Sequence, residues 1–182
     1  GIGSEGDAAD RLRRAGGRIA QAMRNEAQPV SIVGAASDEA ATVALGYSLG
    51  QYRFDRYKTV DKSAPSTQPA TIVVGDVRSA EAEWKSRGVA LAEGVTLTRD
   101  LSTEPANVIY PESFVARVRE AFAGVQGVKI EVLDEAAMRR LGMGTLAGVG
   151  MGSRRPPRLM LVEYRGGSGA PIALVGKGIT FD

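Results

Sequence analysis

Three short apolar runs constrain the fold of this chain more than any other feature. Each run follows a proline and ends at a glycine, and together they occupy residues 29–34, 69–75 and 171–176. Apolar runs of this length between turn residues are typical of buried strands. The first two runs are separated by a segment with helical spacing, and a third helical segment follows them. Strands joined through helices predict a parallel sheet that is covered by helices on both faces.

The helices of the first half are predicted from apolar residues that recur every three or four positions. The first is expected to follow a capping box at residues 4–7 and to end near Asn25. Ser37 or Asp38 is expected to cap the second, and a long third helix is expected over residues 80–101. The side chains expected to face the core are Leu12, Ala15, Ile19 and Met23 in the first helix, Ala41, Leu45 and Leu49 in the second, and Trp84, Gly88, Leu91, Val95 and Thr98 in the third.

A domain boundary is predicted where the long helix ends, because Pro105 cannot continue it. We therefore expect an N-terminal α/β domain with a mainly parallel sheet over residues 1–104. The beginning of a second, mixed-sheet α/β domain is expected over residues 105–182. Its predicted elements are a helix from Pro111 with Phe114, Val118 and Phe122 inside, a strand over 128–132, a short helix capped by Asp134, and strands over 159–164 and 172–175.

The chain contains neither cysteine nor histidine, and this limits its chemistry. Disulfides, thiolate nucleophiles, the Ser-His-Asp triad and His-ligated metal sites are excluded within these 182 residues. The net charge of +2 is too small to indicate a nucleic-acid partner. No apolar stretch is long enough for a membrane helix, and the first residues lack the basic and apolar regions of a signal peptide. These features predict a cytoplasmic protein.

Lys177 and Asp182 follow the last apolar run and are the candidate chemical residues of the chain. In α/β proteins ligands bind just outside the carboxyl ends of strands. The spacing alone favours an ion pair or two solvated side chains. The alternative is a metal site, in which Asp182 supplies a hard oxygen ligand and Lys177 binds only as the neutral amine. Neighbouring dications would lower the lysine pKa enough for this.

Two other motifs have structural interpretations that we prefer. The glycine-rich segment 142–153 lacks both the third glycine of a dinucleotide fingerprint and a Gly-Lys-Ser/Thr sequence, so we interpret it as a close-packed turn. Segment 52–58 alternates aromatic and basic residues, a pattern that can stack and clamp single-stranded nucleic acid. Asp55 and the low net charge favour instead an amphipathic segment that packs Phe54 against a neighbour.

Five motifs in order resemble the leucine (cytosol) aminopeptidase family. They are Gly176 to Asp182 at the last strand end, residues 53–58, the junction from Arg99 to Pro111, residues 141–144, and residues 152–159. The resemblance extends over essentially all 182 residues. Thr103, Ala106 and Met151 depart from the residues that are more frequent in the family, but none of them is at a metal position.

The resemblance implies a two-domain enzyme with two divalent metal ions in its second domain. Lys177 would bind one ion and Asp182 would bridge both, with zinc, manganese or magnesium as the metal. The reaction would be hydrolysis of the amino-terminal residue of a peptide, often leucine, by water that the two ions activate. The enzyme would be a homohexamer.

The resemblance also implies that the chain is an internal fragment. The family's catalytic lysine and its further metal ligands follow the last motif, so no catalytic residue is expected within these 182 residues and the chain alone is expected to be inactive. Two alternatives are a DNA-binding accessory module, which some bacterial relatives suggest, and a non-catalytic assembly module. Peptides, and not nucleic acid, are the partners expected in this interpretation.

Overall fold

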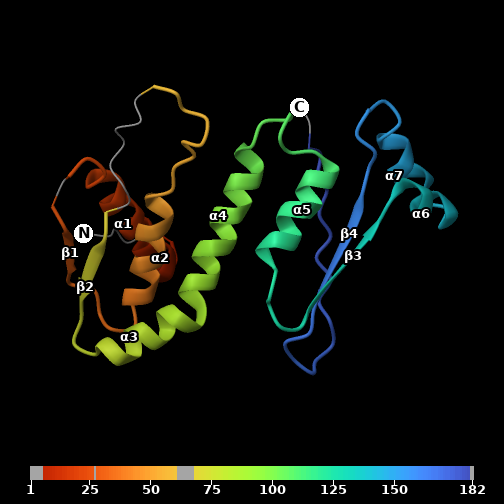
Figure 1. Ribbon diagram of the computed structural model, residues 1–182. Helices are drawn as coiled ribbons and strands as arrows, with labels where there is room; N and C mark the ends of the chain where they lie inside the picture. The colour runs from red at the N-terminus through yellow and green to blue at the C-terminus, as the bar shows by residue number, and fades with distance from the viewer. Residues whose placement is uncertain (1–5, 27, 61–67, 181–182) are drawn as a thin grey trace. The chain divides into compact units, whose positions relative to one another are not determined.

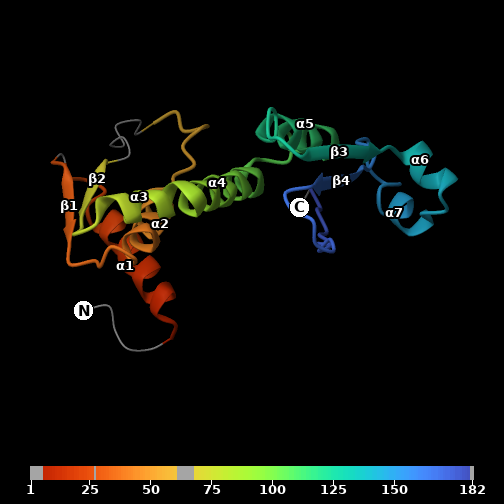
Figure 2. The same cartoon turned by 90° about the horizontal axis from the view of Figure 1, so that it is seen from below.

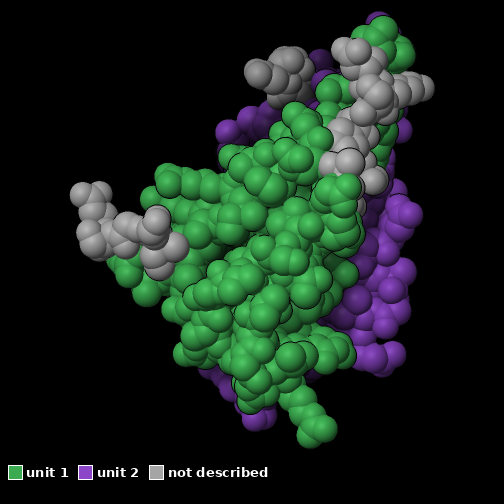
Figure 3. Space-filling model, turned by 90° about the vertical axis from the view of Figure 1, so that its left-hand side faces the viewer, with its two compact units in different colours: residues 1–102 green, residues 103–182 purple. Residues whose placement is uncertain are grey.

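The computed structural model describes residues 6–26, 28–60 and 68–180. The chain forms two compact units, residues 1–102 and residues 103–182 (Figure 3). The domain limits predicted from the sequence, 1–104 and 105–182, concern the domains of the whole protein and stay a prediction. No helix in the described ranges is long and apolar enough to cross a membrane.

Unit 1 contains a two-stranded parallel sheet beside a helical layer (Figure 1). The strands pair in register, from Val30 opposite Ala70 to Val33 opposite Val73. The predicted parallel sheet and the α/β class are therefore confirmed. The elements, in order, are α1 (Ala8–Ala22), β1 (Val30–Val33), α2 (Ala40–Gly50), β2 (Ala70–Val73), α3 (Val77–Glu83), a π-helical turn η1 (Trp84–Gly88) and α4 (Val89–Thr103).

The described residues cover only one face of this sheet, whereas cover on both faces was predicted. Both α1 and α2 lie on the same side of the strands (Figures 1 and 2). On that side Val30 and Ile32 are buried in a cluster with Ala20, Val43 and Tyr47. The opposite face leaves Val33 75% and Val73 51% exposed. Side chains alternate along a strand, so covering one face buries only every second residue.

Helices α1 and α2 pack closely because glycines line their contact. A Cβ built at Gly16 of α1 would lie 2.2 Å from the Val43 carbonyl oxygen. One built at Gly46 of α2 would lie 1.9 Å from the Arg13 carbonyl oxygen. Both distances are shorter than real Cβ atoms accept, so each backbone occupies space that a side chain would otherwise need. This approach brings α1 and α2 onto the sheet together.

The ends of α1 and α2 differ from the prediction. Asp7 caps α1, accepting a hydrogen bond from the Asp10 backbone N–H at 3.3 Å, whereas Ser4 of the predicted capping box lies outside the described residues. Neither Ser37 nor Asp38 caps α2, which begins at Ala40. Ser37 instead accepts a hydrogen bond from the Asp76 backbone N–H at 2.9 Å, which links the loops after β1 and β2. Of the predicted stripe of Ala41, Leu45 and Leu49, only Ala41 is fully buried, and the other buried residues of α2 are Ala40, Val43, Gly46 and Tyr47.

The predicted long helix exists, but it contains a π-helical turn. Residues 77–103 form α3, η1 and α4 in succession (Figure 1). Asp76 caps α3 by accepting from the Ser79 backbone N–H at 3.1 Å. Gly88 is the only predicted core residue of this helix that is fully buried, and Leu91 is 41% exposed. A π-turn changes the side-chain period, so a stripe drawn at constant helical spacing does not stay on one face.

Unit 2 packs a helix and two short helices with an antiparallel strand pair. Pro111 is the first residue of α5, as predicted. Asp134 caps α6 by accepting from the Ala137 backbone N–H at 2.7 Å, which also confirms a prediction. Strands β3 and β4 pair from Val128 opposite Tyr164 to Leu133 opposite Leu159. The elements are α5 (Pro111–Ala121), β3 (Val128–Leu133), α6 (Glu135–Arg140), α7 (Gly144–Val149) and β4 (Leu159–Tyr164).

Three predictions for unit 2 need correction. The inner face of α5 is Val115 and Val118, whereas Phe122 is 36% exposed. The glycine-rich segment is not simply a turn, because it contains α7. The predicted strand over residues 172–175 does not form, and its side chains at Ile172 and Val175 are 89% and 98% exposed. A strand needs a neighbouring strand to receive its backbone hydrogen bonds, and the described part of unit 2 offers none beside this segment.

Candidate functional site

The candidate metal ligands lie in the last part of unit 2. Strand β4 ends at Tyr164, and the Arg165 backbone N–H then donates to the Gly127 carbonyl at 2.9 Å. The following residues, including Lys177, are exposed and have no regular secondary structure. Lys177 makes no hydrogen bond or ion pair with another described residue. Asp182 lies outside the described residues, so the pairing of Lys177 with Asp182 stays a prediction.

The described residues do not form a metal site by themselves. Within the described ranges there is no group of three or more His, Cys, Asp or Glu residues that could hold an ion. A single exposed lysine is an ammonium at neutral pH and has no lone pair for a metal. Lys177 therefore fits a metal centre only together with carboxylates from elsewhere, of which Asp182 is the one that the motif provides.

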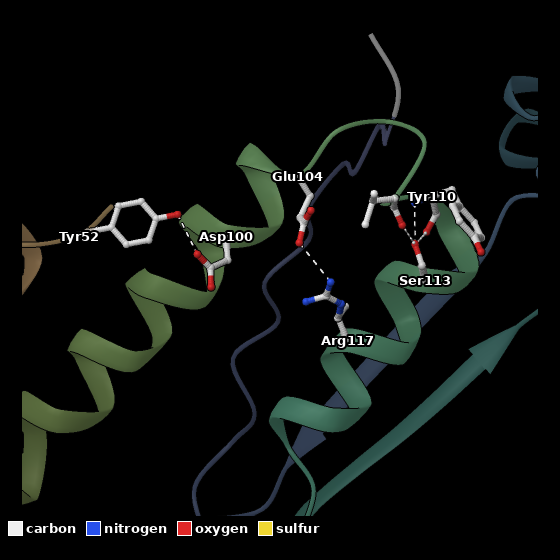
Figure 4. Close-up of polar contacts among 7 residues, drawn as sticks. Tyr52, Asp100, Glu104, Tyr110, Ser113 and Arg117 are labelled. Atoms are coloured by element: carbon white, nitrogen blue, oxygen red, sulfur yellow. Dashed lines mark hydrogen bonds and ion pairs between the residues drawn. The ribbon is translucent and has the colours of Figure 1, made fainter. Parts of the chain in front are cut away.

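A buried ion pair supports the start of unit 2, and the sequence analysis missed it. The side chain of Glu104 is 1% exposed, and its Oε1 atom lies 3.1 Å from Nη2 of Arg117 on α5 (Figure 4). A buried carboxylate is stable only when it is paired and hydrogen-bonded. The pair therefore holds the segment before α5 against that helix. Sequence periodicity does not reveal it, because Glu104 lies in a proline-containing turn with no regular pattern.

The first residues of α5 are fixed by one hydroxyl group. Ser113 Oγ accepts a hydrogen bond from the Tyr110 backbone N–H at 2.9 Å and lies 2.8 Å from the Val108 carbonyl oxygen, to which it donates (Figure 4). The guanidinium group of Arg155 lies over the Tyr110 ring at 3.9 Å from its centroid. Nη2 of Arg158 is 2.9 Å from Glu112 Oε1. Arg155 and Arg158, which precede β4, thus contact the start of α5.

The aromatic and basic segment at residues 52–58 is also engaged within its own unit. The Tyr52 hydroxyl donates to Asp100 Oδ1 at 2.8 Å (Figure 4), and the Arg99 guanidinium lies 5.2 Å from the Tyr52 ring centroid. Asp55 forms ion pairs with Arg53 at 2.9 Å and with Lys58 at 3.0 Å. The hydrogen bond from Lys58, assisted by the charge of Arg53, lowers the pKa of Asp55.

These contacts bear on the two interpretations of the segment. Asp55 pairs with both Arg53 and Lys58, so its single negative charge offsets part of the positive charge that the segment could offer to a phosphate backbone. Phe54 is half-buried and packs against Tyr57 with ring centroids 5.8 Å apart. This ring contact lies within the segment, so the expected packing of Phe54 against a neighbouring element stays a prediction. Nothing in these contacts favours the nucleic-acid alternative.

Two domain models of one protein family match most of the chain. The model of the cytosol aminopeptidase family, N-terminal domain, matches residues 1–61, and that of the cytosol aminopeptidase family, catalytic domain, matches residues 96–182. Relatives named probable cytosol aminopeptidase include those of Bradyrhizobium sp. and Rhizobium etli, which are 38% and 42% identical over the full chain. The chain spans 38% of the length of each.

A solved structure resembles the chain as well. The bottromycin maturation enzyme BotP in complex with Mn is 29% identical, with a TM-score of 0.69 over 89% of this chain and 35% of that protein. A second structure of BotP has a TM-score of 0.63 over 87% of the chain.

Proposed function

The chain belongs to the cytosol aminopeptidase family, and we propose that the whole protein removes amino-terminal residues, such as leucine, from peptides. The catalytic-domain match over residues 96–182 carries this proposal, because it includes Lys177 and Asp182. The relatives' names support a peptidase, and the lack of histidine and cysteine leaves carboxylates and lysine as the groups that this chain contributes. The protein is expected to act in the cytoplasm as a homohexamer on peptide substrates.

Lys177 and Asp182 are proposed as two ligands of a centre for two divalent ions, with further ligands outside this chain. When bound, such a pair supplies water activation near neutral pH and stabilises the negative charge that develops on the scissile carbonyl oxygen. Lys177 must lose its proton to bind, because only the neutral amine has a lone pair. Its exposed position without an ion-pair partner among the described residues leaves the amine available for this role. The manganese bound to BotP supports manganese as one candidate, beside zinc and magnesium.

The test separates peptidase activity from the ligand role of Lys177. The whole protein should hydrolyse leucine p-nitroanilide, and a chelator should abolish this activity. A Lys177→Ala variant should bind fewer metal ions per protomer by elemental analysis, whereas Lys129→Ala, an exposed lysine on β3, should retain the full content. Absence of hydrolysis by the metal-loaded whole protein would refute the peptidase proposal. Unchanged metal content in Lys177→Ala would refute the ligand role alone.

The 182-residue chain by itself is expected to be inactive, because the described residues do not complete a metal site. Turnover by this chain above a blank with metal alone would contradict that expectation. Light scattering of the whole protein measures the hexamer directly, and a monomer under assay conditions would contradict that part of the proposal.

A further inference from the structure

Unit 1 contains a cavity of about 370 Å³ that the peptidase proposal does not use. One helix face, one strand and the π-turn form its wall. The lining residues are Ala44, Tyr47 and Ser48 on α2, Gln51 directly after it, Gln68, Pro69, Ala70 and Ile72 on and before β2, and Trp84 on η1. Ala44, Tyr47, Ser48 and the C-cap residue Gln51 recur at helical spacing, so they present one continuous surface. The volume lies within the range of about 300–1,000 Å³ that is usual for small-molecule sites.

Trp84 is placed at this cavity by the π-turn. A Cβ built at Gly88 would lie 2.1 Å from an atom of the Trp84 ring, so the indole occupies the space that a side chain at Gly88 would fill. The indole is therefore confined against the helix backbone, yet it is only half-buried and forms part of the cavity wall. π-Turns inside α-helices are rare and frequently occur at functional sites.

The chemistry of the lining is neutral throughout. None of the lining side chains carries a formal charge, and apolar groups of Ala44, Pro69, Ala70 and Ile72 alternate with hydroxyl and amide groups. The Tyr47 hydroxyl and the Gln51 amide both donate to the Gln68 carbonyl, at 3.1 and 2.7 Å. These two hydrogen bonds join α2 and its C-terminal end to the residue that precedes β2. Among described residues, the Ser48 hydroxyl and the Trp84 indole N–H have no hydrogen-bond partner.

We propose that this cavity binds a small neutral ligand that combines an apolar group with an amide, such as an apolar residue within a peptide. The apolar group would contact Trp84 and Ile72, and the amide would meet the Ser48 hydroxyl. A charged ligand would lose its hydration without gaining an ion pair, which costs free energy. The inference rests on unit 1 alone and does not depend on the proposed peptidase activity.

Trp84 is the only tryptophan of the chain, so its fluorescence reports on the cavity directly. Titration of the 182-residue chain with N-acetyl-L-leucinamide should give a saturating change in emission. Free leucine, which is a zwitterion, should bind at least tenfold more weakly. Ala44→Leu fills the cavity and should raise the Kd at least tenfold. Ser48→Ala removes one neutral hydrogen bond and should raise the Kd about threefold to tenfold.

Ala90→Leu is the matched control, because it makes the same change at an exposed position of α4 and should leave the Kd unaltered. Far-UV circular dichroism checks that each variant is folded. If Ala44→Leu does not fold, the exposed Ser48→Ala variant decides the question. A linear fluorescence response without saturation, equal binding of free leucine, or the same Kd in Ser48→Ala and the unaltered chain would each overturn the proposal.

Discussion

Adjacent glycines in α1 offer a sharp test of the packing in unit 1. A Cβ at Gly16 would lie 2.2 Å from the Val43 carbonyl oxygen and 2.8 Å from the Tyr47 backbone nitrogen. At Gly17 the nearest atom is the Gly46 carbonyl oxygen at 3.4 Å, which is ordinary van der Waals contact. Both positions are inside the same helix, so Gly16→Ala and Gly17→Ala gain the same helix propensity. They differ only in what the new methyl group meets.

The expected effects have opposite signs. Replacing a glycine inside a helix with alanine stabilises it by about 1 kcal/mol, so Gly17→Ala should raise the free energy of unfolding by about 0.5–1 kcal/mol. The methyl group at Gly16 contacts backbone atoms of α2, which cannot rotate away, so the helices must separate by roughly 1 Å. Overpacking of this kind costs about 1–3 kcal/mol or more. We expect Gly16→Ala to lose about 2 kcal/mol in net stability.

Urea unfolding of the 182-residue chain, followed by Trp84 fluorescence, measures both variants in the unit that they affect. With a urea m-value of about 2 kcal/mol/M, Gly16→Ala should lower the midpoint by about 1 M, and Gly17→Ala should raise it slightly. If both variants moved the midpoint in the same direction by a similar amount, the close approach of α1 and α2 would not exist in solution.

Two further predictions concern the buried polar groups. Glu104→Ala should destabilise unit 2 by about 2–4 kcal/mol, because it breaks a buried ion pair with Arg117. Amide hydrogen exchange in α5 should therefore be faster in Glu104→Ala than in Glu131→Ala, a control at an exposed position, and equal exchange rates in the two variants would contradict the prediction. Burial raises the pKa of Tyr47 above 10.0, so folding favours the neutral phenol. The stabilisation that the neutral Tyr47 phenol gives to the folded state is fully present below about pH 10 and is lost as the pH rises through the folded-state pKa of Tyr47. The urea midpoint should therefore fall above about pH 10 less steeply in Tyr47→Phe than in the unaltered chain, and identical pH profiles would refute the assignment.

The order and type of the elements followed from local patterns. Val30 and Ile32 lie in an apolar run after Pro29, and Val128 to Val132 alternate with polar residues, so both strands were predicted correctly. Pro111 and Asp134 begin helices where their backbone and side-chain chemistry favours a helix start. These preferences depend on residues that are close together in the chain, so they can be recognised from the sequence alone. The family resemblance likewise required only the order of the motifs.

The tertiary structure decided which faces are buried and which groups meet. The close contact at Gly16 and Gly46 determines which face of α2 is buried. The π-turn at Trp84 changes which residues of the long helix share one face. Glu104 pairs with Arg117, which lies on the next helix. The apolar run at 172–175 shows the same dependence, since its composition predicts a strand but the described chain supplies no neighbour to pair with it. Burial and pairing depend on contacts between segments that are distant in sequence. A local pattern specifies which side chains can be buried, and only the folded arrangement determines which residues they pack against.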